Sequence, residues 1–498
     1  MASESVTIFL LCTIVIMVVK ILMSFSKRKI YKFPTGPTPL PIIGNLHLLD
    51  IRRQDLTLMK LAKKYGPIFT FHFGPAKAVV FVGYEANKEA LVNAHYSFGD
   101  RAPIPIADNI QKNHGVIFSN GELWKVTRRF TLSILRDLGM GKRPIEARII
   151  EELQFLCAAI QAFNGKPFDK KVLYLAAPNI SFGMLFGRRF DYDDPTFQGM
   201  INIMDELAIN IGTPAAKCYN AFPILKYFVK EPAFAIDRVN KLNDILKVLF
   251  KEAKEVKWED SFRTYTEAFF QKEEREIVAD EKEKIFTERN LLASTLDIML
   301  GGTETTSTTL QWCILFMMKY PHLQKKAQDE IESVIGLERP PRWDDQTVLP
   351  YCLAVAHESQ RCANIFQYFP HSTPADVHFK DYFIPKGTLI IPLLSSVLND
   401  ETQWETPNQF NPNHFLDADG KFVKKDAFYP FSKGRRVCAG ESLARMELFL
   451  FITGLLQKFT FTPPPGVSTD DLDITPEVVF TMRPKSYKVC ATPRQEAV

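Results

Sequence analysis

The clearest hydrophobic run lies at the N-terminus, where Val6 to Met23 is almost wholly apolar, with Lys20 near its far end. A helix of about 18 residues can just span a hydrocarbon core, and a lysine near its end can reach the interface. The run lacks the combination of a basic n-region and a small-residue cleavage site, so the pattern predicts a retained anchor helix over residues 1–26 and not a removed signal peptide. An interfacial helix is the alternative, but the segment has no polar face. The basic residues that follow predict that the rest of the chain is cytosolic: Lys27, Arg28, Lys29 and Lys32.

Residues 27–47 form a basic and proline-rich stretch, with four prolines between Pro34 and Pro41. Such proline density excludes a helix or a central strand and favours stiff extended backbone. We therefore expect a hinge here, although a plain linker would have the same composition. The globular part is expected over residues 48–498.

Periodicity divides the globular part into a helical middle flanked by short strands. Phe69 to Val82 alternates around Gly74-Pro75, which predicts a hairpin. Residues 121–320 are mainly helical in period, and Thr287 to Tyr320 reads as one long buried helix stopped by Pro321. The charged stretch from Lys251 to Lys284 is most simply a solvated helix face and loop.

The C-terminal third returns to strands and then to helix. Phe379 to Ile391 predicts short strands around the turn Pro385-Lys386-Gly387, and Gly440 to Phe459 predicts a helix. The fold class expected is therefore mainly α with a minor β-sheet region.

Composition excludes several classes of protein. The 498 residues are 46% hydrophobic with a mean hydropathy of −0.08, which fits a large buried core but not many membrane spans. A net charge of +4 without a basic block among aromatics argues against nucleic acid. The eight cysteines are scattered and include no C-x-x-C pair, so neither a disulfide framework nor a structural zinc site is indicated.

One cysteine stands in a long and specific pattern, F-x-x-G-x-R-x-C-x-G. Its members are Phe431, Gly434, Arg436, Cys438 and Gly440, and a helix pattern follows directly. A cysteine at a helix N-terminus faces free N–H groups and the positive dipole end, which favours the thiolate. A thiolate is the axial ligand that a redox-active iron takes, and glycines let backbone approach a flat ligand.

This segment resembles the haem-binding loop of the cytochrome P450 superfamily, and three further patterns agree in order. Gly301 to Thr306 is similar to the oxygen-activation motif, Glu358 to Arg361 to the E-x-x-R motif, and Trp124 to Arg128 to the W-x-x-x-R helix. The stretches 179–192 and 428–451 make the chain most similar to the microsomal animal family 2 enzymes, over essentially everything after the anchor. The resemblance implies the cytochrome P450 fold.

The resemblance also implies a role for each matching residue. Cys438 is the expected iron ligand in haem b, and Thr305 with Glu304 is the expected pair that handles protons during oxygen activation. The loop residues Phe431, Gly434 and Gly440 are expected to contact the cofactor. Its propionates are expected to bind four residues: Trp124, Arg128, His371 and Arg436.

A buried scaffold and a substrate pocket are implied as well. Glu358 and Arg361 share a helix face, and His414 takes the place that the family's P-x-R-F segment gives to arginine. Asp297 is expected either to contact a polar substrate group or, preferably, to pair with a neighbouring arginine. The expected pocket residues are Phe118, Asp297, Gly301, Phe366 and Phe480.

The expected function is a monooxygenase anchored in the endoplasmic reticulum membrane, with its catalytic domain in the cytosol. It would use O2 and electrons from NADPH to hydroxylate or epoxidise xenobiotics, polyunsaturated fatty acids or steroids. No G-x-G-x-x-G unit is present, so NADPH-cytochrome P450 reductase is the expected partner, with cytochrome b5 as a further candidate. Two alternatives stay open: a reductase-independent isomerase or dehydratase of lipid hydroperoxides, and a non-catalytic haem- or lipid-binding membrane protein.

Overall fold

The computed structural model describes residues 32–255, 262–278 and 284–494. The predicted anchor helix and the first part of the hinge lie outside these residues. Within them, no helix combines the length and the apolar character that crossing a membrane requires. The contacts of the chain group into two compact units.

The smaller unit contains the residues up to Ala102 together with Tyr368–Leu393. Its core element is a five-stranded sheet in the order β1-β2-β8-β5-β3, in which β2 pairs parallel to β8. The helices of this unit are η1 (Leu46–Leu48), α2 (Gln54–Tyr65), α3 (Tyr84–Lys88) and η2 (Glu89–Asn93). Its strands are β1 (Ile68–Phe73), β2 (Ala76–Phe81), β3 (Asp100–Arg101), β5 (His371–Ser372), β6 (Val377–Phe379), β7 (Tyr382–Ile384) and β8 (Leu389–Pro392).

The predicted hairpin is confirmed, because β1 and β2 pair antiparallel from Ile68↔Phe81 to Phe73↔Ala76. The strands predicted around Pro385-Gly387 exist but do not form one hairpin. β6 pairs with β7, whereas β8 joins the five-stranded sheet. The turn at 385–387 therefore connects two sheets, a distinction that alternation along one segment does not encode.

The larger unit contains Pro103–Gln367 and Leu394–Val498, and its described part is mostly helical. The first helices are α4 (Pro105–Gln111), α5 (Gly121–Asp137), α6 (Arg143–Gln161), η3 (Lys170–Tyr174), α7 (Ala176–Phe186), α8 (Pro195–Gly212), α9 (Pro214–Ala221), η4 (Pro223–Tyr227), α10 (Glu231–Glu255) and α11 (Tyr265–Val278). The later ones are α12 (Glu288–Lys319), α13 (Pro321–Val334), η5 (Trp343–Thr347), α14 (Pro350–Ala363), α15 (Leu394–Leu398), η6 (Pro412–Phe415), η7 (Gly434–Arg436) and α16 (Glu441–Lys458).

The strands of the larger unit are short: β4 (Phe168–Asp169), β9 (Phe459–Thr462), β10 (Pro476–Val478), β11 (Met482–Pro484) and β12 (Lys488–Pro493). They form a three-stranded sheet in the order β4-β12-β9 and the two-stranded β10-β11. The helix-rich class with minor sheets is thus confirmed.

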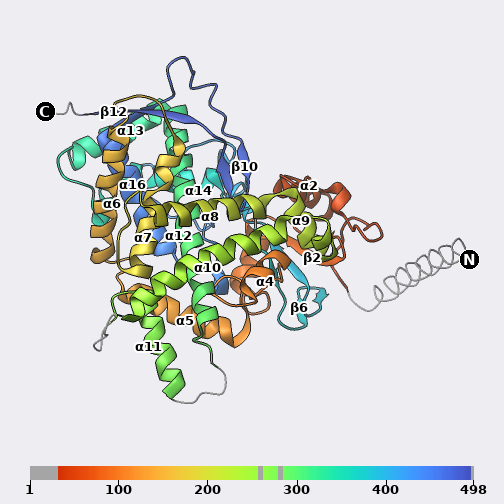
Figure 1. The fold of residues 1–498 in the computed structure, drawn as a ribbon. Coiled ribbons are helices and arrows are strands. Elements are labelled where there is room, and N and C mark those ends of the chain that lie inside the picture. The colour runs from red at the N-terminus through yellow and green to blue at the C-terminus, as the bar shows by residue number, and fades with distance from the viewer. Residues whose placement is uncertain (1–31, 256–261, 279–283, 495–498) are drawn as a thin grey trace, which may run out of the picture. The chain divides into compact units, whose positions relative to one another are not determined.

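The long helix α12 is the central element of the larger unit and packs against α7, α14 and α16 (Figure 1). It begins after Thr287, whose side chain accepts a hydrogen bond from the N–H of Asn290, and ends before Pro321, which opens α13. This agrees with the predicted span. The charged stretch before it is less solvated than expected, because Tyr265, Phe269 and Phe270 of α11 are buried.

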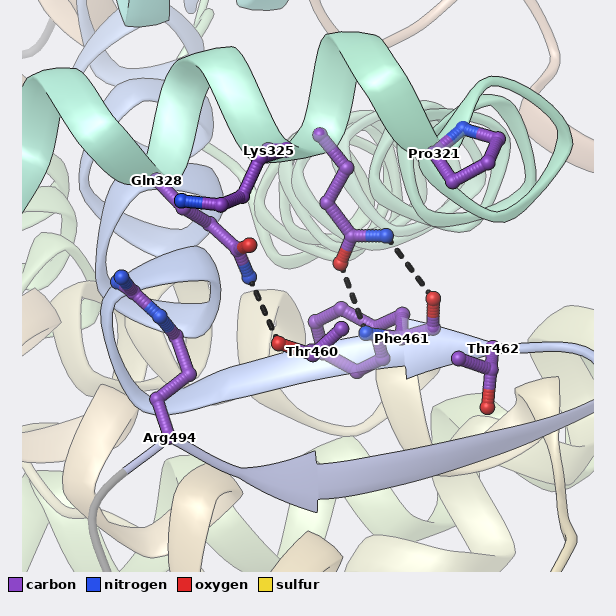
Figure 2. A pocket seen from close by; sticks show the side chains of 8 residues that line it. Pro321, Lys325, Gln328, Thr460, Phe461, Thr462 and Arg494 are labelled. Carbon is purple, nitrogen blue, oxygen red and sulfur yellow. Dashed lines mark hydrogen bonds between the residues drawn. The ribbon is translucent and has the colours of Figure 1, made fainter.

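A surface hollow lies between α13 and the outer strand β9 (Figure 2). Gln324 donates to the carbonyl of Phe461 and accepts from its N–H, and Gln328 donates to the carbonyl of Phe459. These side chains bond the free edge of β9 as a neighbouring strand would. The hollow contains none of the residues for which the sequence predicts chemistry.

Candidate haem site

Two residues with positive φ, Ser432 at 60° and Gly434 at 77°, bend the chain ahead of α16. The N–H of Cys438 then donates to the carbonyl of Phe431 at 3.0 Å, and the N–H of Val437 to that of Gly434 at 3.1 Å. Gly434 suits its position because a Cβ is strained at this φ. The turn leaves Cys438 exposed, unlike the other six cysteines in the described part of the chain.

The surroundings of Cys438 act on the pKa of its thiol in opposite directions. Protein surrounds the sulfur although the residue keeps an exposed surface, and this desolvation raises the pKa of the thiol. The N–H of Gly440 and the charge of Arg128 act in the opposite direction without cancelling it. The N–H at the start of α16 thus acts in the expected direction, and a bound cation would favour the thiolate further.

Trp124 lies beneath arginines of the cysteine loop. The guanidinium of Arg436 is 3.7 Å from the centre of the indole ring and that of Arg435 is 4.8 Å from it. Arg436 also donates to the carbonyl of Ser119 and the side chain of Asn120, and Arg128 donates to the carbonyl of Val437. The predicted W-x-x-x-R helix, α5, is thus joined to the cysteine loop.

This cluster fits an anionic flat cofactor. The indole Nε1 of Trp124 is buried and has no hydrogen-bond partner among the described residues, and such a donor is costly unless something accepts from it. A carboxylate within reach of the indole Nε1 and the arginines would accept that hydrogen bond and balance their charge. Together with the exposed Cys438, the donors fit the carboxylates and the iron of haem b.

The motif on α12 separates into two different faces. A Cβ on Gly301 would meet nothing within 4 Å, whereas a Cβ on Gly302 would lie 2.8 Å from the Cβ of Ser181 on α7. The predicted groove therefore involves Gly301, while Gly302 serves close helix packing. Thr305 is half-buried on α12, and its hydroxyl donates to the carbonyl of Gly301 at 2.7 Å.

Glu304 is fully buried, and its carboxylate is surrounded by donors. Arg483 donates to both oxygens, from Nε at 2.7 Å and from Nη2 at 2.5 Å. Thr481 donates to Oε1 and Tyr174 to Oε2. Sequence reasoning missed all three partners, although an arginine inside an apolar strand is a signal that a buried acid must balance it.

The predicted scaffold is brought together on α14. Arg361 donates to both oxygens of Glu358 at 2.7 Å, and both side chains are fully buried. The ring nitrogen Nδ1 of His414 lies 3.1 Å from the same carboxylate, and Arg361 also bonds the carbonyls of Leu398 and Pro407. Arg361 therefore joins Glu358 on α14 to the end of α15 and to the segment after it, which is a structural arrangement.

Asp297 differs from its expected role. It is buried on α12 and accepts from the side chain of Gln111 and from the N–H groups of Val116 and Ile117. No arginine bonds to it among the described contacts. Burial raises the pKa of its carboxyl to about 6, although these donors lower it. Asp297 thus fixes the loop before α5, and the preference for an arginine partner is wrong.

The aromatic residues predicted for the pocket are half-buried. Phe366, just after α14, and Phe480, between β10 and β11, meet edge to face with ring centres 5.4 Å apart. Phe118 lies half-buried in the loop before α5. His371 belongs to the smaller unit, where its Nδ1 lies 2.7 Å from the carbonyl of Phe98, and its predicted contact with a propionate stays a prediction.

Comparison with known proteins agrees with this arrangement. The family model "Cytochrome P450" matches residues 34–491, so the chain belongs to the cytochrome P450 family. It is 45% identical to human cytochrome P450 2W1 over 93% of this chain and 94% of that protein. It is 44% identical to rainbow trout (Oncorhynchus mykiss) cytochrome P450 2K1 over 99% of this chain and 98% of that protein, and 42% identical to rat (Rattus norvegicus) cytochrome P450 2C23 over 93% and 94%.

Family membership establishes the general chemistry. The protein is a monooxygenase with haem b as its cofactor, and its electrons come indirectly through a reductase. It acts on a small molecule together with O2. The resemblance seen in the sequence, to the family 2 enzymes, is confirmed.

Proposed function

We propose that the protein is a membrane-anchored monooxygenase of the endoplasmic reticulum that hydroxylates or epoxidises hydrophobic small molecules. Its electrons would come from NADPH through NADPH-cytochrome P450 reductase, with cytochrome b5 as a further donor. Xenobiotics, polyunsaturated fatty acids and steroids are the candidate substrate classes. The observation that carries this proposal is the exposed Cys438 in a loop whose arginines pack on Trp124, where the buried indole N–H has no partner in the described part of the chain.

Each residue of the site has a role in this proposal. Haem, when bound, supplies the redox chemistry that activates O2. Cys438 would hold the iron, and Trp124, Arg128 and Arg436 would bind the propionates. Thr305 offers a hydroxyl beside the open face at Gly301.

The apolar walls support a hydrophobic substrate. Phe366, Phe480 and Phe118 are half-buried although each is fully apolar, so all three would gain by covering an apolar ligand. Asp297 is occupied by the loop before α5 and offers no carboxylate to a cationic substrate.

Membrane contact is supported by the segment around η4. Ile224, Tyr227 and Phe228 are 66%, 71% and 81% exposed, and Lys226 and Lys230 beside them are exposed as well. Exposed aromatic and aliphatic side chains next to lysines suit the interface of an anionic bilayer. The predicted N-terminal anchor would act together with this segment.

The ligand assignment is tested by replacing Cys438 with alanine, with C218A as the matched control on α9. We expect the reduced, CO-treated wild type and C218A to show the red-shifted Soret band of a thiolate-ligated haem, and C438A to lack it. A band that persists in C438A would overturn the assignment.

The reaction is tested by product analysis with a panel of fatty acids and xenobiotics, in the presence of the reductase. We expect oxygenated products that require both NADPH and the reductase. Product formation from a lipid hydroperoxide without NADPH would instead support the isomerase alternative.

A further inference from the structure

The carboxylate of Glu304 lies on a face of α12 that is packed against other elements. Ser307, one turn further, donates to the carbonyl of Tyr174, and Thr308 lies fully buried beneath Glu304. Tyr174 belongs to η3, and Arg483 to β11. Glu304 therefore points into the contact between α12, η3 and β11.

Thr305 lies about 100° further around the same helix. It is half-buried, its hydroxyl bonds to Gly301, and the space beside Gly301 is open. Adjacent residues of the oxygen-activation motif thus have different surroundings: Thr305 lies next to the open space at Gly301, whereas Glu304 belongs to a closed ion pair.

Arg483 connects Glu304 to a second helix. Its Nη1 donates to Asp205 on α8 at 2.5 Å, while Nε and Nη2 bond Glu304. The turn between β10 and β11, which precedes Arg483, is also held to α8, because the N–H of Phe480 donates to the carbonyl of Ala208. It is held to α12 by Trp312, which donates to the carbonyl of Met482.

The turn also leaves no space to move towards α8. A Cβ on Gly212 would lie 2.2 Å from the Cα of Val479. The ion pairs of Arg483 with Glu304 and Asp205 therefore fix α8, the β10–β11 turn and α12 to one another, together with the contacts made by Phe480, Trp312 and Gly212. All of these elements belong to the larger unit.

We propose that Glu304 is the buried counter-ion of Arg483 and a positioning residue of α12, not a donor of protons, and that Arg483 joins it to Asp205 on α8. The proposal rests on the monooxygenase activity of the family. Protons that reach Thr305 would then come from solvent on the side of Gly301, without passing through the carboxyl of Glu304.

The charges around the pair agree with this assignment. Burial alone would lower the pKa of Arg483, but the hydrogen bonds and the charge of Glu304 outweigh it and raise the pKa above its ordinary value. A second cation, Lys170, lies near both groups and donates to the carbonyl of Pro484. Glu304 is thus balanced by positive charge and saturated with donors, a poor arrangement for transferring a proton.

The test is a double-variant cycle of E304Q, R483Q and E304Q/R483Q, with D205N as the control that leaves the inner pair intact. For each haem-loaded protein three quantities are measured. They are the thermal unfolding midpoint, the product formed per NADPH consumed, and the ratio of NADPH-driven to peroxide-driven turnover.

We expect E304Q and R483Q each to lower the unfolding midpoint by several degrees, because each leaves one buried charge unbalanced. The double variant should recover most of that loss. Its product yield per NADPH should lie within about twofold of the wild type. D205N keeps the pair of Glu304 and Arg483, so it should lower the midpoint less than R483Q does and leave the product yield and the turnover ratio close to those of the wild type.

The proposal is overturned if the double variant regains stability but its yield and its turnover ratio stay as low as in E304Q. A missing general acid typically costs 10²–10⁴-fold, so this outcome is readily measured. Additive midpoints in the cycle would also overturn it, because no coupling between the two residues would then exist. If R483Q does not fold, the direct comparison of wild type, E304Q and the double variant decides. Failure of the proposed function would differ, since the wild type itself would show no NADPH-driven product.

Discussion

At the scale of single residues, buried acids on facing helices have very different surroundings. Glu304 bonds a guanidinium, and Asp297 bonds amide groups. Glu447 on α16 accepts only from the hydroxyl of Thr306, at 3.1 Å, and its second oxygen has no partner in the described part of the chain. Burial raises the pKa of Glu447 to about 8, so it is largely protonated at neutral pH.

This pKa predicts a pH dependence of stability. Between about pH 4.5, the ordinary value, and pH 8, the folded state holds a proton on Glu447 that the unfolded state has lost. The free energy of unfolding should therefore fall as the pH rises through this range, by up to about 1.4 kcal/mol per pH unit from this group. E447Q should remove that part of the slope.

The measurement is denaturant unfolding of wild type and E447Q at several pH values between 5 and 8. E332Q, at a residue whose side chain is 56% exposed, is the control and should keep the wild-type slope. An E447Q slope equal to that of the wild type would contradict the prediction.

The role of a single residue can be predicted from the sequence where it belongs to a short and specific motif. Cys438 and the pair Glu358 and Arg361 could be found in this way, because spacing alone brings them onto a loop or a helix face. Arg483 could not, since it lies 179 positions from Glu304 and no local pattern joins them. The partners of Asp297 include backbone N–H groups, which leave no trace in a sequence.

At the scale of elements, α12 shows how two adjacent glycines can serve opposite purposes. Gly301 borders open space, while Gly302 allows α7 to approach, with Ser181 directly opposite. Both glycines weaken the helix by about 1 kcal/mol relative to alanine. Only Gly302 offsets this loss of helix stability, because it allows α7 to pack closely against α12.

The two alanine variants should therefore differ in sign. G301A should raise the free energy of unfolding by about 1 kcal/mol, because it improves helix propensity without a clash. G302A should lower it, because its Cβ would come within 3 Å of Ser181 and α7 would have to move.

Denaturant unfolding of both variants measures this difference. G301A should also reduce turnover, since its methyl group would fill the groove beside Thr305. Equal changes in stability for the two variants would show that the glycines are not distinguished by packing.

Element boundaries followed from the sequence where signals were local. The β1–β2 hairpin, the ends of α12 and the span of α16 agree with their turn, cap and proline signals. The pairing of β8 with β2 did not follow, because it joins segments about 300 residues apart in the chain. The burial of α11 was also missed, since its charged residues outnumber the aromatic ones that pack inward.

At the scale of the whole molecule, a net charge of +4 hides an uneven distribution. Lys125 and Arg129 are exposed on α5, the helix that also carries Trp124 and Arg128 towards the cysteine loop. Arg435 belongs to the same basic region but lies over the ring of Trp124. Reversing Arg435 would disturb the haem site, so Lys125 and Arg129 are the cleaner positions for a test.

The charge reversal K125E/R129E should slow NADPH-driven turnover about tenfold at low salt, if the acidic surface of a reductase is steered to this helix. Peroxide-driven turnover should not change, because it needs no electron donor protein. K241E/K251E on α10 makes the same change in net charge and should have little effect on either rate.

Turnover rates over a series of salt concentrations provide the check. The difference between wild type and K125E/R129E should shrink as salt rises. Equal loss of both kinds of turnover would mean that the variant damages the site and not the encounter.

The two glutamines of α13 have a consequence for how crowded copies of this protein behave. An edge strand with unpaired N–H and C=O groups can pair with the backbone of another molecule, and repeated pairing of this kind can extend a sheet into a fibril. Gln324 and Gln328 already bond backbone groups of Phe459 and Phe461 at the edge of β9, from within the same chain. Crowding many copies of this protein together therefore need not start polymerisation at β9.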